Sequence, residues 1–91
     1  MSKADEMLEH LGYERVFRDG ASVIWEGWRK KKKCGSSEKV TGITFNSANG
    51  TVTIETIWKY ANGDVTTLES STLDFEEIQA INEKCKELRG S

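Results

Sequence analysis

Three short turn signals divide the middle of the chain into segments that are too short for long helices. They are Asp19-Gly20, Asn49-Gly50 and Asn62-Gly63. Asp-Gly and Asn-Gly favour tight hairpin turns, because glycine adopts positive φ without steric cost. The runs between these turns are rich in Val, Ile, Thr and aromatic residues, which favour strands. The middle of the chain is therefore predicted to be a series of antiparallel hairpins.

Five strands are expected, with side chains alternating between the two faces of a sheet. Their predicted ranges are 13–17, 21–28, 38–46, 51–60 and 65–70. Residues 30–37 are interpreted as a polar connection between the second and third strands. The fourth strand has the clearest pattern, because Thr, Val, Ile and aromatic residues alternate along its length.

An amphipathic helix is expected before the strands. Four apolar residues recur there at helical spacing: Ala4, Met7, Leu8 and Leu11. Ser2 offers a side-chain acceptor to the first free amides, and Gly12 is placed to end the helix.

A second helix is expected after the strands. Asp74 suits its N-cap, and Glu77 three residues later can close a capping box. Leu73 and Ile78 are placed to form a hydrophobic staple. The apolar stripe continues through Ile78, Ile81, Cys85 and Leu88.

These segments predict one α+β domain over residues 1–91. We expect a five-stranded antiparallel meander sheet, with a short N-terminal helix and a C-terminal helix packed on one face. The 36% of hydrophobic residues and 31% of charged residues suit a folded domain. No internal repeat or low-complexity linker points to a second domain.

The sequence predicts a cytoplasmic protein without a membrane segment. No apolar stretch approaches the ~18 residues of a membrane span, and residues 1–11 lack the apolar core of a signal peptide. Cys34 and Cys85 do not form a disulfide framework, so both thiols are expected to be reduced.

The formal net charge of −2 argues against a general nucleic-acid binder. The charges are nevertheless unevenly distributed. Residues 15–33 contain seven basic and two acidic side chains, whereas residues 62–91 contain seven acidic and three basic ones. A basic region and an acidic region are therefore expected on the surface.

No pattern of catalytic or metal-binding residues is found. His10 is the only histidine and has no further ligands or orienting partner near it in the sequence. Cys34 follows four lysines, which favour the thiolate, but no base lies nearby in the sequence. We expect a protein that is not an enzyme and uses neither a metal ion nor another cofactor.

One run of basic residues is a candidate binding site: Arg29, Lys30, Lys31, Lys32 and Lys33. At a hairpin tip, these side chains would contact phosphates while an aromatic residue stacks on a base. They would equally serve to prevent sheets from pairing edge to edge. Trp25 and Trp28 are three residues apart on a strand, so at least one of them is expected in the core.

The outer face of the sheet is a second candidate site. If Ile43 and Phe45 face the helices, then Trp28, Trp58 and Tyr60 are candidates to face outward. An exposed aromatic cluster would suit protein binding. Alternatively, these rings pack across strands on one another.

Both ends of the chain resemble short uncharacterised proteins encoded by phages and prophages of Gram-positive bacteria (Firmicutes). The start reads ADEMLEHLGYE (residues 4–14), and the end reads LDFEEIQAINEKCKEL (residues 73–88). The resemblance covers roughly a third of the chain and excludes the lysine run. It carries over no catalytic residues.

This resemblance implies a non-enzymatic accessory protein that binds a host protein, for example an anti-CRISPR inhibitor of a defence nuclease. Its acidic C-terminal region would then imitate nucleic-acid phosphates. Two alternatives remain open. One is a small nucleic-acid-binding accessory protein that uses residues 29–33, and the other is a homo-oligomeric structural protein.

Overall fold

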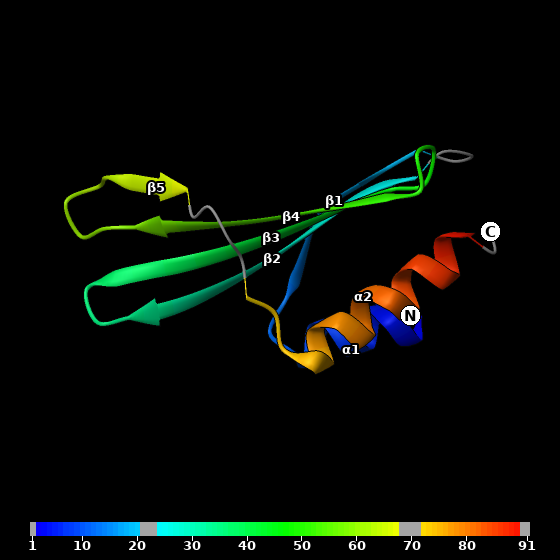
Figure 1. Cartoon of the computed structure of the whole chain (residues 1–91), viewed down its shortest axis with the longest axis horizontal. Coiled ribbons are helices and arrows are strands. Elements are labelled where there is room, and N and C mark those ends of the chain that lie inside the picture. Colours follow the sequence, from blue (N-terminus) through cyan, green and yellow to red (C-terminus); the bar gives the residue numbers. More distant parts are fainter. Residues whose placement is uncertain (1, 21–23, 68–71, 90–91) are drawn as a thin grey trace.

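Five antiparallel strands form one open sheet in the computed structural model, which describes residues 2–20, 24–67 and 72–89. The elements are α1 (Lys3–His10), β1 (Glu14–Asp19), β2 (Trp25–Cys34), β3 (Ser37–Asn46), β4 (Thr51–Lys59), β5 (Val65–Thr67) and α2 (Phe75–Arg89). The strands lie in sequence order, and all neighbours are antiparallel. Both helices lie against one face of the sheet (Figure 1). The predicted α+β meander is confirmed.

Both helix starts are capped as the sequence predicts. The Ser2 hydroxyl accepts a hydrogen bond from the Asp5 amide at 3.1 Å. The Asp74 amide donates to Glu77 Oε1 at 3.0 Å, which is one half of the predicted capping box. Gly12 follows α1 with a φ of 98°, so it ends the helix in the conformation that glycine favours.

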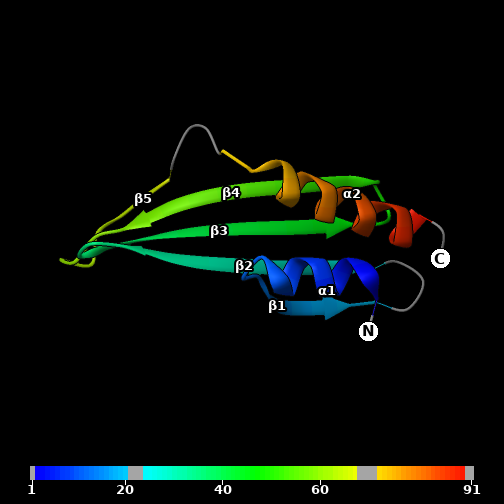
Figure 2. The same ribbon diagram turned by 90° about the horizontal axis from the view of Figure 1, so that it is seen from below.

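The two helices cover one end of the sheet. β1 pairs with Trp25–Arg29 of β2, whereas β2 and β3 pair along their full length. The helices lie over this end, and the other end projects beyond them (Figures 1 and 2). We call the projecting part, residues 30–41 and 56–67, the arm, and the remainder the covered half. The molecule measures 43 × 22 × 21 Å.

The core lies in the covered half, between the helices and the sheet. Its buried members are Leu8, Tyr13, Trp28, Ile43, Phe45 and Ala80. Ile43 and Phe45 face the helices, as expected. Cys85 packs against this core, and both cysteines are free thiols.

The lysine run differs from its prediction. Lys30–Cys34 belongs to β2 and continues in register to the pair Cys34↔Ser37, so the connection to β3 is only Gly35 and Ser36. Polar composition was interpreted as a loop, but the backbone of β3 pairs with the lysines regardless of their side chains. In the Asn49-Gly50 turn, Gly50 has a positive φ of 65° and Asn49 does not have a positive φ.

Two predicted strand segments, residues 21–23 and 68–70, lie outside the described residues. Within the described ranges, no helix is long and apolar enough to cross a bilayer.

Candidate functional site

Three ionisable side chains meet in the covered half, between the helices and the sheet. Lys84 Nζ of α2 lies 2.6 Å from Asp5 Oδ1 of α1 and 2.6 Å from Glu26 Oε2 of β2. The Lys84 and Glu26 side chains are 2% and 0% exposed. The predicted apolar stripe of α2 is therefore partly wrong: Lys84 faces inward while Ile78 is half exposed. An ammonium group tolerates this burial because two carboxylates compensate its charge.

Two arginines of β1 extend this buried charge cluster. Arg18 Nε lies 3.5 Å from Glu26 Oε1, and Arg15 Nη1 lies 3.9 Å from Asp5 Oδ2. The Trp28 indole donates a hydrogen bond to Glu26 Oε2 at 2.8 Å. Among the described residues, Glu26 Oε1 is buried without a hydrogen-bond partner, so Arg18 supplies its nearest compensating charge.

The charge cluster keeps Asp5 ionised. Burial alone would raise the pKa of the Asp5 carboxyl, but the Lys84 ammonium, the Ser2 hydroxyl and Arg15 outweigh it. The net effect is a pKa below its usual value. Asp5 is therefore a carboxylate at neutral pH and completes the ion pair with Lys84.

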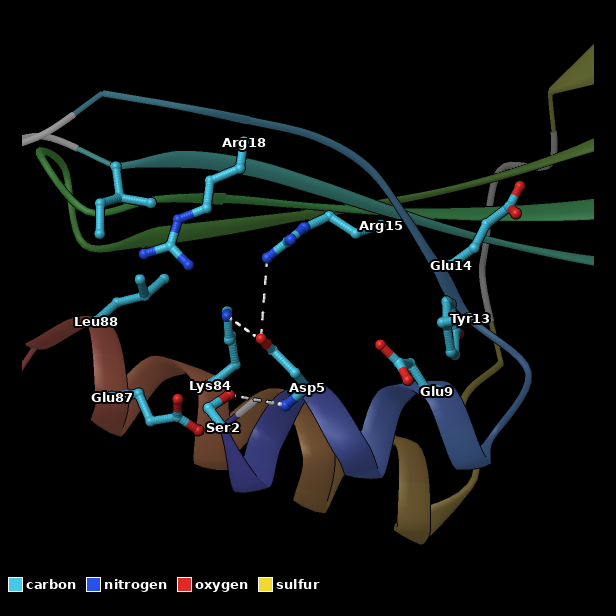
Figure 3. Close-up of a pocket in the computed structure, with 11 residues that line it drawn as sticks. Ser2, Asp5, Glu9, Tyr13, Glu14, Arg15, Arg18, Lys84, Glu87 and Leu88 are labelled. Atoms are coloured by element: carbon cyan, nitrogen blue, oxygen red, sulfur yellow. Dashed lines mark hydrogen bonds and ion pairs between the residues drawn. The ribbon is translucent and has the colours of Figure 1, made fainter.

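A groove of about 910 Å³ opens beside this cluster, between α1, β1 and the end of α2 (Figure 3). Arg15 and Arg18 extend into it from β1, and Lys84 and Asp5 lie on its helix side (Figure 3). The four charged groups at the centre of the groove are already engaged: Lys84 and Arg15 with Asp5, and Arg18 with Glu26. We therefore assign this cluster to holding four elements together and not to binding a ligand.

A second polar cluster lies where the arm leaves the covered half. Glu77 Oε2 accepts hydrogen bonds from the Tyr13 hydroxyl and from Lys30 Nζ, the latter at 2.9 Å. Burial and the neighbouring Glu77 carboxylate raise the pKa of Tyr13 well above its usual value. Burial would raise the pKa of Glu77, but the Asp74 amide, Tyr13 and Lys30 lower it overall. Lys30 is therefore partly a structural residue.

The predicted basic run divides between the two faces of the sheet. Trp28 of β2 is buried beneath the helices. Lys30 and Lys32 are two and four residues after it, so they lie on the same face of the sheet, the one that carries the helices. Lys31 and Lys33 lie on the opposite face. Lys32 is directly opposite Lys39 of β3, and Lys39 is directly opposite Trp58 of β4. Sequence reasoning missed Lys39, because only the register of β2 and β3 places it beside the run.

Arg29, the first residue of the run, lies at the edge of the covered half. Its Nη2 donates to Glu14 Oε1 at 3.1 Å. In the register, Arg29 is opposite Gly42. It therefore shares a face with Lys31 and not with Lys30.

The three predicted aromatic residues do not form one cluster on the outer face. Trp28 is 2% exposed in the core, so its prediction as an outward-facing ring is wrong. The Glu26 carboxylate, itself buried, bonds the indole and holds it beneath the helices. Trp58 is half-buried on the same face as Trp28, but in the arm. Tyr60 follows β4 and is exposed.

The open face of the sheet, opposite the helices, carries a shallow apolar depression of about 190 Å³. Its floor includes Gly27 and Gly42, and its walls include Val16, Phe17 and Ile57. A Cβ on Gly27 would lie 2.3 Å from Phe17 Cε1, so the ring rests directly on the glycine. Phe17 thus covers Gly27, whereas the space above Gly42 is open and contributes to the depression.

Three apolar side chains on this face of the sheet are exposed. Val16, Phe17 and Trp25 are all at least one-third exposed. Trp25 is two residues from Gly27 on β2 and so lies on the same face. Together, the depression and these side chains are the open-face surface, which sequence reasoning did not identify because it placed Trp28 there.

No group of His, Cys, Asp and Glu within the described residues has an arrangement that could hold a metal ion. His10 is exposed at the end of α1. Comparisons with protein-family models, with curated proteins and with solved structures find no match for this chain.

Proposed function

We propose that this chain is a non-enzymatic binding protein that docks on a host protein through its open-face surface. The carrying observation is the exposure of Val16 and Phe17 at the depression, with the exposed ring of Trp25 on the same face of the sheet. Exposed aromatic side chains beside a pocket are typical anchors of protein–protein interfaces. The depression has room for one apolar side chain of the partner.

The proposed partner is a protein of a bacterial host cell. The resemblance of residues 4–14 and 73–88 to phage-encoded proteins supports a bacterial host protein as the partner. A defence protein such as a CRISPR nuclease is the proposed class, inhibited by steric occlusion. We propose the host cytoplasm as the location, since the free thiols Cys34 and Cys85 suit a reducing compartment.

The test is affinity capture from a nuclease-treated lysate of a Gram-positive host, followed by titration of the purified partner. Trp25→Lys removes an exposed ring from the open-face surface. Phe75→Lys is the matched control, because Phe75 is 87% exposed on α2, on the helix side of the sheet. We expect Trp25→Lys to weaken binding at least tenfold and Phe75→Lys to leave it unchanged, as for an interface anchor.

Equal binding by both variants would contradict the proposal. So would a partner that is captured only from a parallel lysate without nuclease treatment. Light scattering after size-exclusion chromatography provides a separate check. If the wild type is a dimer and Trp25→Lys is a monomer, the open-face surface binds a second copy and the host-protein proposal fails.

A further inference from the structure

We propose that the helix-side face of the arm binds single-stranded nucleic acid. This arm face consists of Lys30, Lys32, Lys39, Thr41 and Trp58. Lysines would hold phosphates, and the indole would stack on one base. The arm face lies on the opposite side of the sheet from the open-face surface, so this proposal does not depend on the proposed function.

The arm face carries a pair of like charges. Lys32 and Lys39 are directly opposite each other on neighbouring antiparallel strands. Like charges in this position destabilise a sheet. By contrast, the next lysine along this stretch of β2, Lys33, is opposite Glu38. A bound phosphate would convert the Lys32–Lys39 repulsion into two attractive contacts.

A hollow of about 160 Å³ lies beside this pair. It is lined by Lys30, Lys32, Lys39, Thr41, Thr72, Asp74 and Glu77. Glu77 is already bonded to Lys30, to Tyr13 and to the Asp74 amide. Lys30 therefore offsets Glu77, and within the described residues neither Lys32 nor Lys39 forms an ion pair, so the three lysines of the hollow outnumber its two acids and leave positive charge for a phosphate group.

The half-buried ring of Trp58 lies next to Lys39 across the strands. Sheet faces that combine aromatic rings with basic side chains bind single strands, because unpaired bases stack on the rings. In a duplex the bases are stacked on one another in the interior, so no base is free to stack on the Trp58 ring. An acidic peptide would satisfy the lysines but not the indole. We therefore favour a single strand.

The distribution of charge along the chain also favours binding of a polyanion at the arm. The arm contains six basic and two acidic residues, whereas the rest of the chain contains seven basic and thirteen acidic ones. A polyanion is repelled by the acidic remainder and attracted to the arm. The arm is therefore basic although the net charge of the chain is −2.

The test uses the full chain and a fluorescently labelled single-stranded oligothymidylate of 12 nucleotides. Fluorescence anisotropy would give the dissociation constant at several salt concentrations. Two to three neutralised phosphates predict a slope of log affinity against log salt of about −1.4 to −2. Between 50 and 200 mM salt, this corresponds to roughly 7- to 20-fold weaker binding.

The matched variants are Lys32→Gln/Lys39→Gln on the arm face and Lys31→Gln/Lys33→Gln on the opposite face. The first pair should reduce the slope by about 1.4, whereas the second should leave it nearly unchanged. Trp58→Leu should weaken binding roughly tenfold at constant slope, since it removes stacking and no charge. Circular dichroism would confirm that each variant is folded.

Several results would overturn the proposal. One is no detectable binding at 50 mM salt by folded wild-type protein. Another is equal loss in the two lysine pairs, which would indicate general attraction without a defined face. Binding of a duplex or of polyglutamate as tightly as the single strand would also contradict it, because neither offers an unpaired base.

Discussion

Lysine has two different roles in the two halves of this molecule. In the covered half, Lys84 is 2% exposed and lies 2.6 Å from two carboxylates. In the arm, Lys32 is exposed and is opposite another lysine. The difference comes from what covers the sheet: where α1 and α2 lie over it, a charge needs partners to be buried, and beyond them it remains in water. A buried ion pair holds elements together, whereas an exposed excess of charge is available to a ligand.

Tryptophan repeats the contrast on a single face of the sheet. Trp28 and Trp58 both lie on the helix side, but only Trp28 is under the helices. Trp28 donates a hydrogen bond to buried Glu26. Trp58 lies next to Lys39 and is half-buried. The covered half therefore stabilises the fold, and the arm presents side chains.

The largest expected effect is from replacing the buried lysine. Lys84→Met leaves Asp5 and Glu26 without their ammonium partner, which should lower the free energy of unfolding by about 3–5 kcal/mol. Urea denaturation followed by circular dichroism measures this. Lys86→Met on the exposed side of the same helix is the control and should change it by less than about 0.5 kcal/mol. A similar loss in both variants would contradict the assigned role of Lys84.

The tryptophan contrast predicts the next largest difference. Trp28→Phe removes core volume and leaves Glu26 Oε2 without its indole donor. It should therefore lower the free energy of unfolding by about 2 kcal/mol. Trp58→Phe removes neither a core contact nor a described hydrogen bond, and it should cost less than about 1 kcal/mol. Thermal unfolding of the two variants tests the order. Equal losses would mean that the arm is packed as tightly as the covered half.

Acid should weaken the covered half through Asp5 and Glu77. Both carboxyls have a pKa below the usual value in the folded chain. Their contribution to stability is therefore fully present above the unfolded pKa of about 4 and is lost as pH falls through the folded pKa. Between pH 5 and pH 2, Asp5→Asn should lose less free energy of unfolding than the wild type does. Urea denaturation at each pH measures this. An unchanged pH profile would contradict this role of Asp5.

The smallest expected effect is in the arm and has opposite signs at neighbouring positions. Lys32→Gln relieves repulsion with Lys39 and should raise the free energy of unfolding by roughly 0.3 kcal/mol. Lys33→Gln loses the attraction of Glu38 and should lower it by a similar amount. Denaturation curves collected in parallel at low salt would show the opposite signs, and high salt should remove both. Shifts of one sign for both variants would argue against the register.

Local patterns in the sequence predicted the elements well, because turns and caps act over a few residues. Gly12 and Gly50 have the positive φ expected of them, and the Asp74 amide bonds Glu77. The lysine run was misassigned as a loop, because strand pairing here depends on β3 and not on lysine itself.

The sites were less predictable than the elements, because their members come from distant segments. Asp5, Glu26 and Lys84 are each unremarkable in the sequence, and only the packing of α1, β2 and α2 brings them together. The sequence leaves open whether Trp28 faces outward or lies in the core, because the alternation along β2 does not determine its face until one register is fixed. Lys39 joined the basic run for the same reason.

The most direct test of the division between the covered half and the arm is amide hydrogen exchange along β2, measured by NMR. This strand is continuous from Trp25 to Cys34 and crosses both halves. We predict that its hydrogen-bonded amides between residues 25 and 29 exchange only through global unfolding. Those between residues 31 and 34 should exchange much faster, through local opening of the arm. Equal protection along the whole strand would contradict the account, because the arm would then belong to the stabilising core.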